Sequence, residues 1–176
     1  MKNNAVFKFI DSAISTVINP IVIILSLLIT GMLTVGIASR IVIGDPIFGL
    51  EEIVLICVMW LYMLGATLAA KERTHLAADF VQVITKNRKI IHFMKLVASI
   101  ISLIIAIFFA TWSYDLVTWA IEKKQTTPVF HIPWYYSQGS LFCASIFFII
   151  YLTRDVINDL TELFKNDSDA NEEGDR

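Results

Sequence analysis

The chain is a succession of long apolar runs separated by short polar segments. Four of these runs have almost no charged residues and approach or exceed the ~20 residues that a helix needs to cross ~30 Å of hydrocarbon. The pattern predicts membrane-spanning helices over residues of about 18–39, 52–71, 94–115 and 133–154. We therefore expect an all-α integral membrane protein whose single four-helix membrane domain occupies residues 1–165.

The amino-acid composition supports a membrane location. Of the 176 residues, 56% are hydrophobic and 17% are charged, and the mean hydropathy is +0.68. A soluble fold of this length exposes much of its surface and could not bury so many apolar side chains. A cleaved signal peptide is the competing interpretation of the first run. That run is too long, and Gly36-Ile37-Ala38 is only weakly similar to a cleavage site, so we expect an uncleaved anchor.

The lysine and arginine residues predict which side of the membrane each loop occupies. With four spans, both termini share a side with the segment between the second and third spans. The opposite side holds only Arg40, Lys123 and Lys124 of the 14 basic residues. Because basic residues collect in cytoplasmic loops, we expect both termini to lie in the cytoplasm.

Two short segments combine an apolar stripe with a polar face and are predicted to lie along the membrane surface. They cover residues 4–16 and residues 75–86. Amphipathic helices of this kind fit the headgroup boundary. A cytoplasmic helix folded onto the bundle would have the same pattern, so that alternative stays open. The polar, acidic segment 166–176 is predicted to be a disordered tail.

Small side chains recur at four-residue spacing in every predicted span. Such stripes let the backbones of membrane helices approach closely, whereas apolar burial drives no association between helices in lipid. The four helices could use these stripes on one another or on a partner. The stripes are Ser26, Thr30, Thr34 and Ala38; Gly65, Ala66, Ala69 and Ala70; Ala98, Ser102, Ala106 and Ala110; and Ser140 and Ala144.

The second span ends in a dense polar cluster formed by Arg73, His75 and Asp79. We expect these residues to cap the inner end of the span and to fix the turn into the surface helix. His75 and Asp79 are four residues apart and could pair on one helix face. A helix end that is simply solvated is the alternative.

The sequence carries no recognisable catalytic or cofactor-binding motif. It has no CxxC, no HExxH and no phosphate-binding glycine loop, so we expect no enzymatic activity, no cofactor and no nucleic-acid partner. Cys57 and Cys143 lie in apolar runs and are interpreted as small buried hydrophobic residues. His75, His92 and His131 lie at span ends or in a loop. Haem ligation would instead need histidines that face each other inside the bundle.

No acidic or basic residue lies in the middle of a predicted span. Such a residue costs roughly 2.5–3.5 kcal/mol on insertion and usually marks transport or coupling chemistry. No span has the unwound, glycine- and proline-interrupted middle that builds substrate and ion sites. We therefore expect that the chain moves neither solute nor protons by itself.

The second span and the residues after it resemble a family signature. The positions that carry the resemblance are a Glu at the start of the span, Trp60, Leu64-Gly65-Ala66, Ala70, Arg73, His75 and Asp79. They are similar to the small membrane subunit of tripartite ATP-independent periplasmic (TRAP) transporters, as are the chain length, the four spans and the cytoplasmic termini. Ala77 and Ala78 depart from the pattern, because the family often has a basic residue and a valine there.

The resemblance implies a small, non-transporting permease subunit in the bacterial inner membrane. It would bind the large membrane subunit and extend its static scaffold. The large subunit would take up an organic acid, with sodium, by an elevator-type movement. A periplasmic binding protein would deliver the acid, which would be a C4-dicarboxylate or, favoured by general likeness, sialic acid.

Two groups of site residues follow from the resemblance and the charge pattern. On the second span, close packing against a neighbouring helix is predicted for Trp60, Gly65, Ala66, Ala69 and Ala70. Scattered charges of both signs suit a weak, reversible protein contact. The candidates for docking the binding protein are Arg40, Asp45, Glu51, Glu52, Glu122, Lys123 and Lys124.

Three other functions stay open at this point. The chain could be a haem or quinone membrane anchor, a self-sufficient small dimeric transporter, or a structural membrane protein with a different partner. The colour of the purified protein would discriminate the first. Co-purification with a much larger membrane subunit would discriminate the last.

Overall fold

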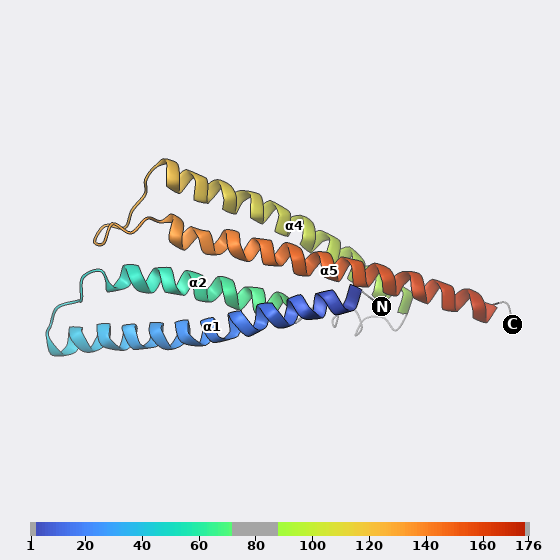
Figure 1. The fold of residues 1–176 in the computed structure, drawn as a ribbon, viewed down its shortest axis with the longest axis horizontal. Helices are drawn as coiled ribbons and strands as arrows, with labels where there is room; N and C mark the ends of the chain where they lie inside the picture. The colour runs from blue at the N-terminus through green and yellow to red at the C-terminus, as the bar shows by residue number, and fades with distance from the viewer. Residues whose placement is uncertain (1–2, 72–87, 175–176) are drawn as a thin grey trace.

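The computed structural model describes the backbone of residues 3–71 and 88–174 and the side chains of residues 16–71 and 90–161. Within this part the chain is helical except for the loops 43–49 and 123–134. The helices are α1 (Asn3–Val42), α2 (Leu50–Lys71), α4 (Arg88–Glu122) and α5 (Tyr135–Gly174) (Figure 1). Each contains a segment long and apolar enough to cross a membrane, which confirms the four predicted spans.

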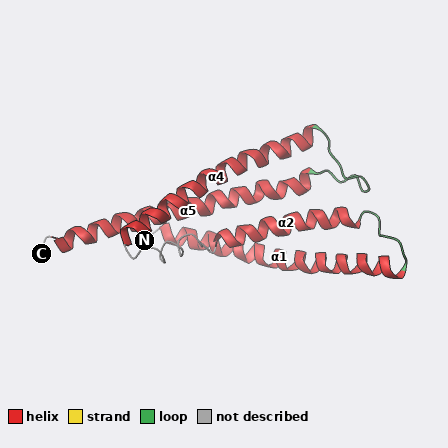
Figure 2. Cartoon of the chain, turned by 180° about the vertical axis from the view of Figure 1, so that it is seen from behind, coloured by secondary structure: helices red, strands yellow, loops and turns green. Residues whose placement is uncertain are grey.

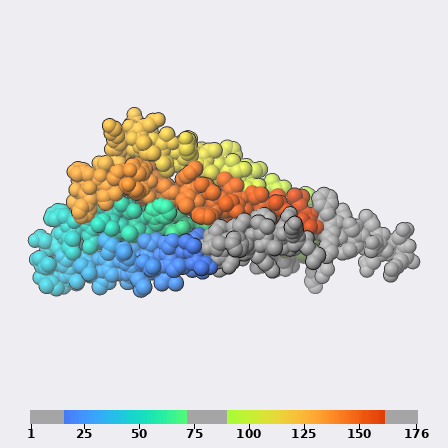
Figure 3. Space-filling view, viewed as in Figure 1, coloured from blue at the N-terminus to red at the C-terminus, as the bar shows by residue number. Residues whose placement is uncertain are grey.

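The helices form an open row and not a closed bundle. α1 packs on α2, α2 on α5, and α5 on α4, so the last helix of the chain lies second from one edge (Figure 1). Between the described residues, no comparable contact joins α1 to α4. All four helices are visible on the same broad face in the space-filling view (Figure 3). Much of the apolar surface of the row is therefore not covered by other described parts of the chain.

The row spreads towards one end. The helices lie close together near the N-terminus, beyond which α5 projects alone towards the C-terminus, and they diverge towards the two loops, as both ribbon views show (Figures 1 and 2). We call these the termini end and the loop end; the loop end is defined by residues 43–49 and 123–134. With 35 residues, α4 is about 50 Å long at 1.5 Å per residue, well beyond the thickness of the hydrocarbon core.

Small side chains form the contact between α4 and α5, which is the most extensive in the row. Ala106 and Ala120 of α4 are buried, as are Ser140 and Ala144 of α5. Their size lets the two backbones approach, as the spacing of small residues predicts for membrane helices. Of the predicted stripes, Ser140 and Ala144 of the fourth span are buried, but only Ala106 of the third-span stripe is, since Ala98, Ser102 and Ala110 are half-buried.

The contact between α1 and α2 uses a different face of α1. Ile18, Ile29 and Ser39 are buried. Ile18 and Ile29 are about three turns apart and lie on one stripe, and Ser39 lies to one side of it. Gly36 continues this stripe, and a Cβ built on it would lie 3.3 Å from the Leu50 side chain. The predicted small stripe of α1 lies elsewhere, since Thr30 and Thr34 are exposed.

The first and last helices extend into the two end segments of the chain. α1 runs without a break from Asn3 through Pro20 to Val42, so it includes residues 4–16, which were predicted as a surface helix. α5 continues to Gly174 and includes most of the segment that was predicted as a tail. Residues 4–16 contain neither glycine nor proline, and the same holds for residues 162–173, so nothing local ends either helix. The predicted surface helix 75–86 lies outside the described residues.

Candidate functional site

The loop 123–134 is folded into a small hairpin next to α2. The Thr127 amide donates to the Ile132 carbonyl at 2.9 Å, and the Trp134 amide donates to the Gln125 carbonyl at 3.0 Å. The Thr127 hydroxyl also accepts from the Ile132 amide at 3.0 Å. His131, at the tip, has a positive φ of 51°. We call residues 125–134 the outer hairpin.

Glu52 of α2 binds the tip of the outer hairpin. Its Oε1 accepts a hydrogen bond from the Val129 amide at 2.7 Å, and its Oε2 accepts one from the Phe130 amide at 3.0 Å. Consecutive backbone amides that converge on a carboxylate form an anion-binding nest, and hydrogen bonds to an ionised acceptor are stronger than neutral ones. The carboxylate of Glu52, predicted as a docking charge, is therefore already engaged within the chain.

Two further contacts join α2 to the segment that carries the outer hairpin. The Trp60 indole Nε1 donates to the Tyr136 carbonyl at 3.0 Å, so Trp60 links α2 to the first turn of α5. Before α2, Gly49 has a φ of +82°, and a Cβ on it would overlap the ring of Phe130. Only glycine fits there, because the backbone is left-handed and the ring lies against it.

The other predicted docking residues lie at the same end, and two of them pair with each other. Arg40 of α1 donates to Glu51 of α2 at 2.6 Å, with both side chains largely exposed. Asp45, Lys123 and Lys124 are exposed as well. The predicted docking residues thus all lie at the loop end. Glu52 differs from the others because its carboxylate binds backbone amides of the outer hairpin.

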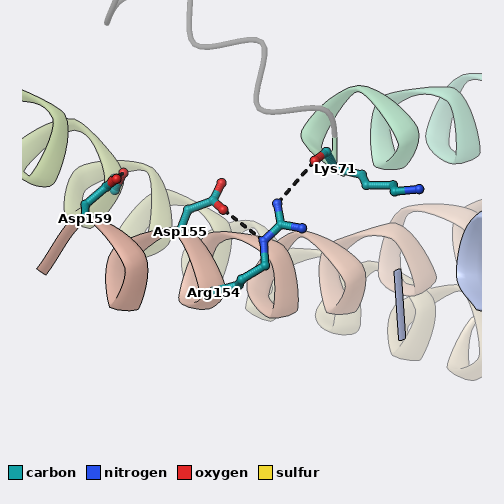
Figure 4. A network of polar contacts seen from close by, with 5 residues as sticks. Lys71, Arg154, Asp155 and Asp159 are labelled. Carbon is teal, nitrogen blue, oxygen red and sulfur yellow. Dashed lines mark hydrogen bonds and ion pairs between the residues drawn. The ribbon is translucent and has the colours of Figure 1, made fainter. Parts of the chain in front are cut away.

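A second polar site lies at the termini end, between α5 and its two neighbours. Arg154 Nε donates to Asp155 Oδ1 at 3.0 Å, and Arg154 Nη2 donates to the Lys71 carbonyl at the end of α2 at 3.2 Å (Figure 4). The Ser99 hydroxyl of α4 donates to Asp159 Oδ2 at 2.5 Å. Together these contacts connect α5 to both helices beside it.

This termini-end cluster is largely shielded from solvent. Arg154 is 9% exposed, Asp155 1% and Asp159 7%. Burying charges costs several kcal/mol per ion unless they are paired and hydrogen-bonded, so each partner in the cluster matters for stability. Arg154 also lies over the Tyr151 ring, with the guanidinium carbon 5.2 Å from the ring centre, at a distance that allows a cation–π interaction.

This cluster was not predicted from the sequence. The predicted fourth span ended at residue 154, and no role was assigned to Asp155 or Asp159. A signal was present, because Tyr151, Asp155 and Asp159 recur every four residues and therefore share one helix face. Two acidic residues one turn apart, on the same stripe as a tyrosine of a membrane-apolar helix, indicate a buried polar contact.

The predicted packing residues of α2 fall into two groups. Trp60 reaches a neighbouring helix through its indole N–H. A Cβ built on Gly65 would meet no atom within 4 Å, so Gly65 is not pressed against another described helix, and Ala69 is exposed. Leu64 and Thr67, which the sequence analysis did not single out, are the buried residues of α2.

Three predicted site residues cannot be placed in this arrangement. Arg73, His75 and Asp79 lie outside the described residues. Cys57 and Cys143 are free thiols and half-buried, in keeping with their interpretation as small apolar residues.

Comparison with known families matches residues 29–162 to the family described as tripartite ATP-independent periplasmic transporters, DctQ component. The chain belongs to the DctQ family. The matched region is more than half of the chain and includes the second to fourth spans, the outer hairpin and the termini-end cluster. No curated protein matches the sequence. The DctQ component is the small permease subunit of a TRAP transporter, which agrees with the four apolar helices and with the resemblance that the second span predicts.

Proposed function

We propose that this DctQ-family chain is a non-transporting scaffold that binds the large membrane subunit of its transporter. The observation that carries the proposal is the open row. Among the described helices α1 makes extensive contact with α2 alone, and its outward face is apolar: Leu27 is 70% exposed and Ile37 is 60% exposed. On α2, Gly65 has room for another helix to approach closely.

The polar contacts of the row support a static role. The described polar clusters lie near the two ends of the helices, and each is made of groups that bond within the chain. A transporting helix bundle would carry polar groups or broken helices near mid-membrane, where they bind solute or ions. We infer that the large subunit moves the solute and that this chain stays in place beside it.

The complete activity we propose is sodium-coupled, elevator-type uptake of an organic acid delivered by a periplasmic binding protein. Sialic acid and a C4-dicarboxylate are the candidate substrates. The chain would lie in the bacterial inner membrane with both termini in the cytoplasm, because most of its basic residues share that side. The loop end would then face the periplasm.

Co-purification tests the scaffold proposal. An affinity-tagged chain, extracted in mild detergent from cells that also express the large subunit, should retain that subunit through gel filtration. The chain alone, reconstituted in vesicles, should accumulate neither acid under a sodium gradient. Accumulation by the chain alone would overturn the proposal, and so would failure to retain the large subunit.

Docking of the binding protein is tested at the loop end. Arg40→Glu and the pair Lys123→Glu and Lys124→Glu should each reduce uptake by the assembled transporter without changing retention of the large subunit, since rim charges mainly affect encounter with a partner. Unchanged uptake in both variants would exclude these residues from docking.

A further inference from the structure

Glu52 differs from the other charged residues of the loop end in what its carboxylate contacts. Arg40 and Glu51 pair with each other in an exposed position, whereas both oxygens of Glu52 are occupied by backbone amides of the outer hairpin. Those amides belong to Val129 and Phe130, which follow Glu52 in the sequence by 77 and 78 positions. The contact therefore connects the start of α2 to the connection between α4 and α5.

The position of this contact matters because the row diverges there. α4 and α5 lie closest to α2 at the termini end and spread away from it towards the loops (Figures 1 and 2). Two more contacts reinforce the same connection: Trp60 Nε1 to the Tyr136 carbonyl, and the Phe130 ring against Gly49. All three join α2, or the turn just before it, to residues between the outer hairpin and the first turn of α5.

We propose that Glu52 is a positioning residue that fixes the outer hairpin, and with it the loop ends of α4 and α5, at a set distance from α2. Its two carboxylate oxygens match the two amides that the tip of the hairpin presents side by side. The left-handed backbone at His131 and the glycine at position 49 let the tip close onto α2. The row is thereby closed at the end where helix packing alone would leave it open.

Hydrogen exchange reads the proposed contact directly, because its donors are two backbone amides. Each variant is purified as the full chain in lipid nanodiscs, and exchange is followed by mass spectrometry with fragmentation across residues 125–134. In Glu52→Ala, the Val129 and Phe130 amides should exchange at least about tenfold faster, as expected when a hydrogen bond to a charged acceptor is lost. Glu52→Gln, which keeps one carbonyl oxygen for two donors, should give a smaller increase.

Glu51→Gln is the matched control. It removes the same charge one residue earlier, but its partner is Arg40 and not the hairpin, so the two amides should keep their slow exchange. If Glu52→Ala also loses protection throughout α2 and α5, the substitution has disturbed the whole fold. The test of the positioning role then rests on the exchange rates of the two amides in Glu52→Gln. Equal exchange of the Val129 and Phe130 amides in Glu52→Gln and in the unaltered chain would overturn the proposal.

A distance measurement tests the consequence for the helices. Spin labels at Ile53→Cys and Thr126→Cys, in a chain with Cys57 and Cys143 replaced by alanine, report the separation of α2 from the outer hairpin. The distance distribution should broaden in Glu52→Ala and stay narrow in Glu51→Gln. An unchanged distribution in Glu52→Ala would show that Trp60 and Phe130 hold the hairpin without Glu52 and would refute the positioning role.

The proposal bears on the proposed function, because a scaffold must keep its shape while its partner moves. Uptake by the assembled transporter should therefore fall in Glu52→Ala while the large subunit is still retained. The two ideas fail separately. Loss of amide protection without loss of uptake would leave the positioning role intact and would remove its importance for transport. If the chain retained no large subunit in the co-purification, the scaffold function would be contradicted, but the exchange result would still support the positioning role of Glu52.

Discussion

Arg154 and Lys71 meet at the termini end of the row, 83 residues apart in sequence, where Arg154 Nη2 donates to the Lys71 carbonyl oxygen at 3.2 Å. The last carbonyls of a helix lack partners within it, and a cation near them is favoured by the helix dipole. Arg154 thus caps the C-terminal end of α2 from the neighbouring helix, and its ion pair with Asp155 keeps a buried carboxylate next to a positive charge.

Arg154→Gln should lower the free energy of unfolding by about 3 kcal/mol, the usual cost when one partner of a buried ion pair is removed. The side chain of Arg154 is 11% exposed and that of Asp155 is 1% exposed, so solvent cannot replace the lost contact. Unfolding by denaturing detergent, followed by circular dichroism, measures the change.

Arg40→Gln provides the comparison for that prediction. It also breaks an arginine–carboxylate pair, but one whose side chains are 59% and 79% exposed, and exposed pairs contribute roughly 0–1 kcal/mol. Equal effects of the two substitutions would contradict the assignment of Arg154 to a buried joint.

Ser99→Ala should also destabilise the chain, by roughly 1.5–3 kcal/mol, because it removes a hydrogen bond to the buried carboxylate of Asp159. Thr111→Ala on the same helix is the control, since its hydroxyl is exposed and bonds only to the Phe108 carbonyl of its own helix. Thermal unfolding in nanodiscs, read at far-ultraviolet wavelengths, should separate the two variants. A stability of Ser99→Ala equal to that of Thr111→Ala would remove the α4–α5 polar contact as a stabilising feature.

Two glycines of the first loop offer a test of the contact with the outer hairpin. Gly44 and Gly49 have nearly the same φ, +85° and +82°, but a Cβ at Gly44 would meet nothing within 4 Å, whereas at Gly49 it would overlap the Phe130 ring. Replacing either with alanine strains the backbone by about 1 kcal/mol. Gly49→Ala should cost more, because the ring must also move. Chemical unfolding of both variants measures the difference, and equal costs would argue that Phe130 does not press on the loop.

Gly65→Leu tests whether α2 receives a partner helix. The added side chain meets open space within this chain, so stability alone should change little. Retention of the large subunit should fall, because a bulky side chain prevents close approach of two membrane helices. Gly31→Leu on α1, where a Cβ also meets nothing within 4 Å, is the control for simple enlargement of an exposed glycine. Full retention in Gly65→Leu would place the partner elsewhere on the row.

Two of the predicted site residues have partners that are distant in the sequence. Trp60 was predicted to pack against a neighbouring helix, and its indole donates a hydrogen bond to the first turn of α5. Glu52 was predicted as a docking charge for the binding protein, and nothing near Glu52 in sequence reveals that two amides more than 70 residues later bind its carboxylate. The packing predicted for Gly65, Ala66, Ala69 and Ala70 stays a prediction about a partner.

The sequence by itself determined that the chain has four helices long and apolar enough to cross a membrane, because the transfer of some twenty apolar residues into lipid depends only on local composition. It also carried the family signature in the second span. Only the tertiary structure decided the order of the helices, the engagement of Glu52 and the buried cluster around Arg154. Lipid solvates every apolar face of a helix equally well, so hydrophobic pattern does not say which face meets which neighbour, and the polar contacts that fix the neighbours join residues far apart in the chain.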